Sequence, residues 1–243
     1  MPLIKTIDAA RDAGLPTLRT VFDHDELSRV LRSFALIPPE ADASKGIQVR
    51  VLKWWPGSRC TFEIAYESPT GCLELIGKVY SQNRPDVYKA MENLWNAGFQ
   101  SEKEFAIPRP IAYIEPLRLL LCEKVLGVRA KKLLLGSDQA ARARAATQCA
   151  RWLAQFHARA PRFSPILDLS EYPVHLQSLS EGFAEFGSGT AAKSRQLFRQ
   201  LERVASRLRG GMICASHGTF GPGQVLAMRS IHNSGKSSKR KSN

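Results

Sequence analysis

Three consecutive strand-like segments in the first third of the chain constrain its fold more than any other sequence feature. Residues 47–55 are rich in β-branched and aromatic side chains, which favour strands. In residues 60–67 apolar side chains alternate with more polar ones, and this period of two is typical of a half-buried strand. Short turns containing Pro and Gly, at 56–59 and 68–71, separate these two segments from each other and from a third at 72–80. Because short turns join antiparallel neighbours, the pattern predicts an antiparallel meander.

The next segments predict one helix and a hairpin, after which the chain becomes mostly helical. Residues 85–97 have an apolar face at helical spacing and begin with a proline, which suits a first helical turn. Residues 111–115 and 117–123 predict a further hairpin. Beyond them, 138–160 and 191–209 are amphipathic and predict two long helices. We therefore expect an α+β fold with a five-stranded antiparallel sheet and one helix in its N-terminal half.

Changes in composition divide the chain into four parts. Residues 1–46 predict a helical lead-in, and 47–125 predict a strand-rich N-terminal lobe. Residues 126–228 predict a helical C-terminal lobe that contains a loop at 216–224. Residues 229–243 hold five Lys or Arg and neither Asp nor Glu, with too few apolar residues to fold. We expect a disordered basic tail there.

Charge and hydropathy limit the classes of partner. The formal net charge is +13, which favours an anionic partner, either a nucleic acid or a small ligand such as a nucleotide. Basic residues are dense only in the tail, and the tail has no aromatic side chain to stack on bases, so a nucleic acid is the less favoured partner. No apolar run has the length of a membrane span, and the N-terminus lacks the apolar segment of a signal peptide. A cytoplasmic protein with no membrane partner is expected.

Lys78 is the first of four features that could carry chemistry. It lies in the apolar third strand, where an ammonium group without a partner is costly, unless the residue is on the solvated face of that strand. The turn at 56–59 could bind phosphate through its backbone amides, although a plain hairpin turn explains it better. An apolar strand that runs into the charged connector 123–127 is typical of a hinge between lobes or of an ordinary strand end. The fourth feature is the loop at 216–226.

This loop resembles the catalytic loop of aminoglycoside phosphotransferases and their relatives. That family carries His-Gly-Asp, four further residues, Asn or a near equivalent, and then an apolar strand. Here His217, the glycine after it, the spacing, a Pro-Gly pair and the following apolar residues match. Residues 152–157 resemble the family's preceding helix, and 123–127 resemble its hinge. The resemblance covers about residues 45–228 and implies a protein-kinase-like two-lobe fold with an incomplete helical C-terminal lobe.

The resemblance also implies ATP-dependent phosphorylation of a small-molecule hydroxyl, with Mg²⁺ as the metal. Lys78 would hold the nucleotide phosphates, and Glu92 on the next helix would orient Lys78. The turn at Ser58 would cradle phosphates, and the backbone at Glu123 and Val125 would bind the base. Because the family's acceptors range from antibiotics to sugars, the resemblance names no particular acceptor.

Departures from the family pattern predict that phosphoryl transfer is lost or severely impaired. Thr219 stands where the family has the aspartate that accepts the proton of the attacking hydroxyl, and loss of a general base costs about 10²–10⁴ in rate. Gln224 replaces the asparagine that holds a metal ion, and the resemblance gives His217 a scaffold role. No acidic residue follows Met228, although the family has a second metal-binding aspartate there. This predicts weak Mg²⁺ binding and suggests a truncated or frame-shifted product.

Two alternatives belong to other functional classes. One is a pseudokinase-like module that binds a nucleotide or a partner without chemistry, and only an assay of turnover separates it from an enzyme. The other is a nucleic-acid-associated protein that binds through its basic tail. Deletion of 229–243 would then abolish binding, and the affinity would fall steeply with salt.

Overall fold

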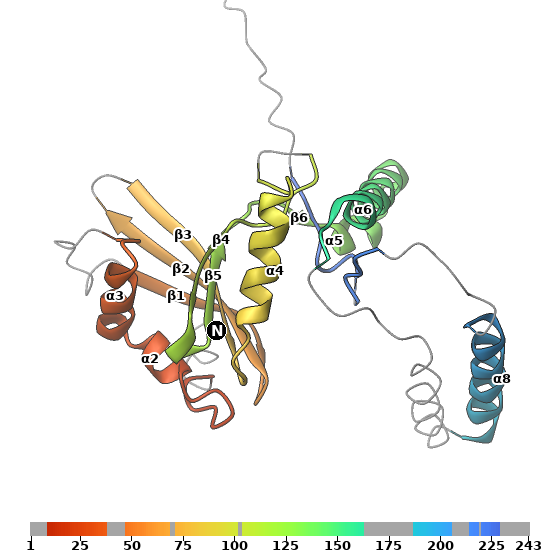
Figure 1. Ribbon diagram of the computed structural model, residues 1–243, viewed down its shortest axis with the longest axis horizontal. Coiled ribbons are helices and arrows are strands. Elements are labelled where there is room, and N and C mark those ends of the chain that lie inside the picture. The colour runs from red at the N-terminus through yellow and green to blue at the C-terminus, as the bar shows by residue number, and fades with distance from the viewer. Residues whose placement is uncertain are drawn as a thin grey trace, which may run out of the picture. The chain divides into compact units, whose positions relative to one another are not determined.

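The computed structural model describes residues 9–37, 47–68, 71–101, 104–162, 187–205, 214–218 and 220–228 (Figure 1). These residues belong to two compact units. The first unit contains Met1–Pro161 and His217–Asn243, and the second contains Arg162–Ser216. The second unit is thus an insertion in the sequence of the first.

A five-stranded antiparallel sheet with the order β1-β2-β3-β5-β4 forms the centre of the first unit (Figure 1). The three strands of the predicted meander are neighbours, and the later hairpin adds to the free edge of β3. The strands are β1 Ile47–Trp55, β2 Arg59–Ser68, β3 Gly71–Tyr80, β4 Pro110–Ile114 and β5 Leu119–Glu123. The predicted α+β class and the five-stranded antiparallel sheet are confirmed.

One face of the sheet, which we call the inner face, is buried. Strand β2 contributes the alternate residues from Cys60 to Tyr66 to it. The side chain of Phe62 is fully buried and packs edge-to-face on Phe22, with ring centroids 5.6 Å apart. Gly77 lies opposite Phe62 on β3 and leaves room for this ring, since a Cβ atom at residue 77 would lie 2.3 Å from it. A large and a small residue therefore complement each other across β2 and β3.

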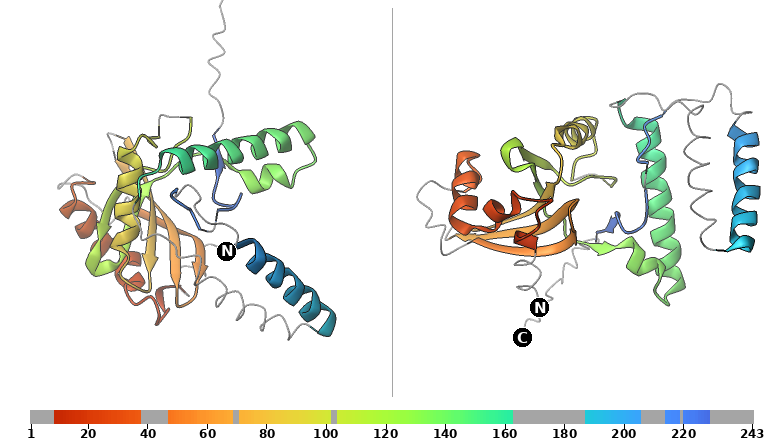
Figure 2. Two further views of the ribbon diagram at one scale, coloured as in Figure 1. Left: turned by 45° about the vertical axis from the view of Figure 1, so that its right-hand side comes forward. Right: turned by 90° about the horizontal axis from the view of Figure 1, so that it is seen from below.

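Two helices of the lead-in, α2 (Leu18–Phe22) and α3 (His24–Ser33), cover the inner face (Figure 2). Asp23 caps α3, because its carboxylate accepts hydrogen bonds from the backbone amides of Asp25 and Glu26. Burial of a large aliphatic side chain contributes about 1.5–3 kcal/mol, which explains why the helix predicted in this region forms. The fully buried apolar side chains of the two helices are those of Leu18, Val21, Leu27 and Leu31.

Before α2, Asp12 ties the lead-in to the turn between β1 and β2. Its carboxylate accepts from the Trp54 indole and the Gly57 backbone amide, both at 2.8 Å, and from the Gly14 amide at 2.9 Å. Gly14 lies directly against Gly57, where an added Cβ atom would be 2.4 Å from the Gly57 Cα atom. Burial raises the pKa of Asp12, but the hydrogen bonds outweigh it, so the net shift is downward. The carboxylate is therefore charged at neutral pH and stabilises the turn.

Replacing Asp12 by alanine is expected to lower the free energy of unfolding by about 1–3 kcal/mol, because three donors lose a charged acceptor. The contribution of this carboxylate is complete above its unfolded pKa, near 3.8, and is lost as the pH falls through the lower folded-state pKa. Urea denaturation at neutral pH measures the effect. Asp25→Ala, an exposed carboxylate in the first turn of α3, is the control and should cost less than about 1 kcal/mol. Equal losses in the two variants would contradict the role given to Asp12.

The opposite face of the sheet, the outer face, is only partly covered. Helix α4 (Pro85–Asn96) packs against β4, and none of its residues belongs to the cluster of buried side chains that packs on the inner face (Figure 2). It ends before Gly98, whose φ of 95° favours glycine. The helix predicted over 85–97 is confirmed. Along β1 and β3 the outer-face side chains are half-exposed or exposed.

After β5, a connector at 124–127 leads into the short strand β6 (Val128–Arg129), helix α5 (Ala130–Leu134) and helix α6 (Gln139–Arg159). Helix α6 matches the predicted long helix, and Asp138 caps it by accepting from the Ala141 amide at 3.0 Å. The two-residue strand β7 (Leu226–Ala227) pairs antiparallel with β6. Strand β6 and helix α5 were not predicted, because segments of two and five residues are too short to show a periodic pattern of apolar side chains.

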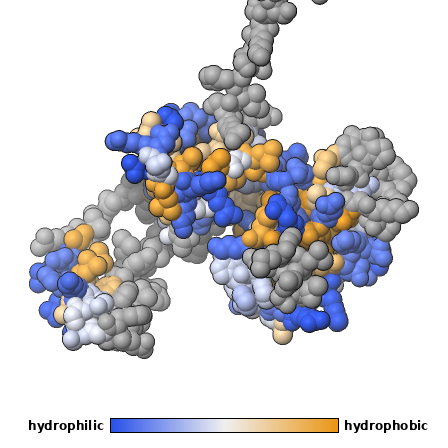
Figure 3. All heavy atoms as spheres, turned by 180° about the vertical axis from the view of Figure 1, so that it is seen from behind, coloured by the Kyte–Doolittle hydropathy of each residue, from blue (hydrophilic) through white to orange (hydrophobic). Residues whose placement is uncertain are grey.

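Helix α8 (Ser188–Ala205) is the element described in the second unit. Its predicted apolar residues Leu197, Leu201 and Val204 are 42–55% exposed, and Figure 3 shows apolar side chains beside charged ones on this helix. Residues 163–186, the predicted helix end at 206–209 and the predicted tail at 229–243 lie outside the described residues. Within the described ranges, no helix has the length and apolar character needed to cross a membrane.

Candidate functional site

Lys78 lies on the outer face of β3, because the flanking residues Gly77 and Val79 face inward. Its neighbours across the sheet are Thr61 on β2 and Leu120 on β5. The side chain is half-buried, and among the described residues it has no hydrogen-bond or ion-pair partner. The ammonium group is therefore available to an anionic ligand.

Glu92 forms no ion pair with Lys78 in the described part of the chain. The hydroxyl of Tyr88, one turn earlier on α4, donates to the Glu92 carboxylate; burial first, and then this hydrogen bond, raise the pKa of Tyr88. Lys78 instead lies near the Cys122 thiol of β5, where burial raises the thiol pKa and the ammonium lowers it in part. The structure thus does not bring the two predicted residues together as a pair.

The turn at Ser58 has backbone amides that are already hydrogen-bonded. The Gly57 amide donates to Asp12 at 2.8 Å, and the Ser58 amide donates to the Trp55 carbonyl at 3.1 Å. The Ser58 carbonyl accepts from the Ser81 amide at 2.9 Å, which joins the turn to the end of β3. A phosphate at the predicted position would have to replace existing hydrogen bonds.

Glu123 and Val125 differ in what they offer a ligand. The Glu123 carboxylate accepts from the Ser101 hydroxyl at 2.5 Å and from the Arg109 amide at 3.1 Å. The Glu123 amide donates to the Arg109 carbonyl at 2.9 Å. The Val125 amide, by contrast, has no partner among the residues that the structure describes. A backbone donor therefore remains in the connector at the position predicted to contact a base.

A buried carboxylate next to the connector, Glu63, was missed by the sequence analysis. Glu63 is 7% exposed and forms ion pairs with Arg50 on β1 and Lys124 in the connector. Lys124 also pairs with Glu74 on β3 at 2.5 Å. The hydrogen bond from Lys124 lowers the pKa of Glu63; burial opposes this shift and Arg50 reinforces it. Alternation along β2 identified Glu63 only as an outward residue, which gave no sign of its burial.

The loop that resembles a catalytic loop packs on α6 through aromatic rings. The imidazole of His217 lies 5.7–6.4 Å, between ring centroids, from Trp152, Phe156 and Phe220. The Trp152 and Phe220 rings stack with centroids 5.5 Å apart. His217 is nevertheless exposed, and its scaffold role stays a prediction. Thr219, at the predicted position of the general base, lies outside the described residues.

The same loop lies next to the connector, although α6 and the second unit separate the two segments in sequence. Strand β6, which directly follows the connector, pairs with β7, which directly follows the loop. Two further backbone hydrogen bonds join Ala130 to Val225 at 2.9 Å and Lys131 to Pro222 at 3.0 Å. The β6–β7 pair and these two hydrogen bonds, which we call the ribbon, bring the predicted hinge and the predicted catalytic loop together.

The side chain of Gln224 already makes a contact within the loop. Its side-chain oxygen Oε1 accepts from the Gly221 amide at 2.9 Å and so closes the loop on itself. Among the described residues, no three His, Cys, Asp or Glu side chains gather as a metal site. Mg²⁺ prefers an octahedral set of oxygen ligands that includes carboxylates. Within the described residues there is thus no preformed set of carboxylates for Mg²⁺, and the weak Mg²⁺ binding expected from the sequence stays a prediction.

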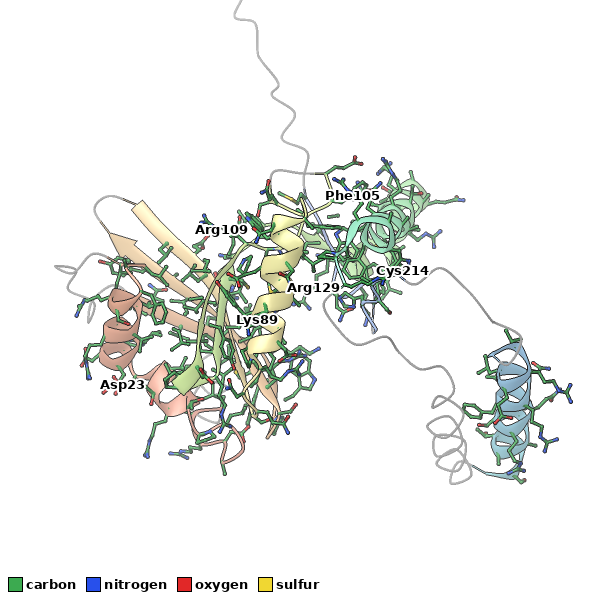
Figure 4. The ribbon with its side chains drawn as sticks, viewed as in Figure 1. Asp23, Lys89, Phe105, Arg109, Arg129 and Cys214 are labelled. Carbon is green, nitrogen blue, oxygen red and sulfur yellow. The ribbon has the colours of Figure 1, made fainter. Side chains whose placement is uncertain are left out.

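A cavity of about 390 Å³ lies away from these residues, between the C-terminal end of α4 and helix α6. Phe105 marks it in Figure 4. It is lined by Gly98, Phe99, Glu104, Phe105, Gln155 and Arg159. None of the predicted site residues that the structure describes lines this cavity.

Comparison of the sequence with models of protein families and with curated proteins gives no match.

Proposed function

We propose that this chain is a nucleotide-binding protein of the aminoglycoside phosphotransferase type, in which phosphoryl transfer to a small-molecule hydroxyl is lost or severely impaired. A helix between β3 and β4 of a five-stranded antiparallel sheet, followed by a connector and helices, supports the proposal. In kinase-like proteins of two lobes, a lysine on the third strand holds phosphates. Lys78 and the Val125 amide have no other partner among the described residues and are available for phosphate and base.

The pairing of β6 with β7 is the observation that carries the proposal. It places residues 217–224 beside the connector. A nucleotide with its base at Val125 and its phosphates at Lys78 would lie near the loop in which the related enzymes hold their catalytic residues. If residues 123–127 were only the end of a strand and not a hinge, there would be no functional reason for the loop at 217–224 to lie beside them.

The chemistry of the loop supports binding without transfer. Thr219 carries a neutral hydroxyl, and loss of a general base costs about 10²–10⁴ in rate. The amide oxygen of Gln224 already accepts from Gly221. Among the described residues, no group of three His, Cys, Asp or Glu side chains could hold the metal ion that would stabilise the charge that develops in phosphoryl transfer.

Lys78→Ala is expected to weaken ATP binding about tenfold or more, because the variant lacks the ammonium group that contacts the phosphates. Calorimetric titration of the full chain with ATP measures the change, and titration with adenosine should show no difference between variant and parent. Lys89→Ala is the matched control, since Lys89 is exposed on α4 (Figure 4). It should bind ATP like the parent chain.

Three outcomes would contradict the proposal or part of it. A folded parent chain, judged by circular dichroism, that binds neither ATP nor GTP would refute nucleotide binding. An unchanged ATP affinity in Lys78→Ala would refute the role of Lys78. Rapid ATP turnover in the presence of Mg²⁺ and a hydroxyl acceptor would refute the loss of phosphoryl transfer.

A further inference from the structure

A bulge in β1 turns two residues that the sequence analysis left unassigned onto the outer face. The register between β1 and β2 shifts between Val51 and Lys53. After the shift Trp54 faces inward, where its indole donates to Asp12. Lys53 and Trp55 therefore face outward, on the same side as Lys78.

Basic side chains gather on this part of the outer face. Two rows of residues run across β1, β2 and β3: Lys53, Thr61 and Lys78 in the first, and Trp55, Arg59 and Tyr80 in the second. Neighbouring strands are about 4.8 Å apart and alternate residues of one strand about 6.8 Å apart, so long side chains from both rows can reach one ligand. We call Lys53, Arg59 and Lys78 the basic cluster.

The basic cluster carries charge that no described carboxylate neutralises. In the part of the chain that the structure describes, none of its three residues has an ion pair with a carboxylate. The Nε atom of Arg59 is buried and has no hydrogen-bond partner. The neighbouring carboxylates are engaged elsewhere: Glu63 with Arg50 and Lys124, Glu74 with Lys124, and Asp86 with Arg84. Like charges at neighbouring sheet positions destabilise the fold, so an anion bound there would relieve a repulsion.

Trp55 holds two of the three cations in place. The Lys53 ammonium lies 3.8 Å and the Arg59 guanidinium 4.4 Å from the centroid of its ring. Cation–π attraction orders both groups without neutralising them. Beside them, burial raises the pKa of Tyr80, and Arg59 and Arg84 lower it in part. The Tyr80 hydroxyl thus stays protonated and can donate a hydrogen bond to an anion.

We propose that the basic cluster is a polyphosphate site that binds a nucleoside triphosphate without a divalent metal ion. The inference rests on the proposed nucleotide function and deepens it, because Lys53 and Arg59 supply the positive charge that Mg²⁺ supplies in active phosphotransferases. Three cations that have no carboxylate partner among the described residues suit a phosphate chain. Affinity should therefore rise with the number of phosphates and fall with salt.

The test is calorimetric titration of the full chain with ATP, ADP, adenosine and inorganic tripolyphosphate, each in excess EDTA and again with Mg²⁺. ATP should bind at least as tightly in EDTA as with Mg²⁺, and adenosine should bind far more weakly. Arg59→Ala and Lys53→Ala should each lower the ATP affinity about tenfold. Lys53→Gln, at an exposed position, keeps a polar side chain without the charge and should show the same loss in a folded protein. Arg29→Ala, on α3 across the inner face, is the control and should change nothing.

The outcomes separate this inference from the function on which it rests. ATP binding that requires Mg²⁺ and is indifferent to Lys53 and Arg59 would overturn the metal-free site and leave nucleotide binding intact. Tripolyphosphate binding through the cluster, with ATP no tighter, would support the polyphosphate site and refute recognition of the base. A short oligothymidylate that binds more tightly than ATP through the same side chains would overturn the inference in favour of single-stranded nucleic acid.

Discussion

Phe62→Ala is expected to lower the free energy of unfolding by about 3–5 kcal/mol, because it empties the centre of the inner face. The Phe62 side chain is fully buried and contacts the ring of Phe22 from the lead-in. Its loss therefore weakens both the sheet and the docking of α2. A change of this size is a large share of the roughly 5–15 kcal/mol that stabilises a typical domain. Urea denaturation followed by far-ultraviolet circular dichroism measures it.

Gly77 provides an internal check on this prediction. Gly77→Ala places a Cβ atom 2.3 Å from the Phe62 ring, and overpacking of this kind costs about 1–3 kcal/mol. In the double variant Phe62→Ala/Gly77→Ala, the new methyl group enters the space that the ring leaves. The combined loss should thus be smaller than the sum of the single losses. Strict additivity would contradict the packing described for β2 and β3.

Glu63→Ala is expected to cost about 2–3 kcal/mol, below the range of a fully buried ion pair because one of its partners, Arg50, is 61% exposed. The change leaves Lys124, whose side chain is 20% exposed, with Glu74 as its partner. Because the folded-state pKa of Glu63 is lowered, its contribution is complete above the usual value of 4.5 and is lost as the pH falls through the folded-state pKa. Urea denaturation of parent and variant between neutral and acid pH should therefore show the difference in stability shrinking toward acid.

Glu74→Ala is the matched control for Glu63. It removes the other carboxylate bound to Lys124, but Glu74 is 41% exposed, and exposed ion pairs contribute about 0–1 kcal/mol. If both variants lose the same stability, burial is not what makes the Glu63 pairing strong. A Glu63→Ala loss that persists unchanged in acid would contradict its electrostatic origin.

The sheet could be predicted from the sequence because its signals are local. Alternation in β2 identified Phe62 and the alternate residues on either side of it as inward-facing, and a proline at the start of α4 marked that helix. Short turns with Pro or Gly then fixed the antiparallel order of the meander. Each of these signals lies within a few residues of the element that it predicts.

The candidate site was predicted less well because its geometry depends on non-local effects. The bulge after Val51 changes which residues of β1 face outward, and no proline or glycine marks it, so Lys53 and Trp55 gave no functional signal. Glu63 forms ion pairs with a residue on β1 and a residue in the connector. Its burial could not be predicted without knowing that these segments lie beside β2. Strands β6 and β7 are too short for a period and meet across most of the second half of the chain.

The distribution of pairing along the sequence has a consequence for synthesis on the ribosome. Strands β1 to β5 all precede residue 124, so the complete sheet can form while the second half of the chain is still being translated. The pairing of β6 with β7 cannot form at that stage, because residues 226 and 227 of β7 have not yet been synthesised. A nascent chain would thus present the basic cluster, including Lys78, on a finished sheet before the loop at 217–224 has been synthesised. If the chain binds a nucleotide as proposed, the ligand would meet the finished sheet before this loop has been synthesised.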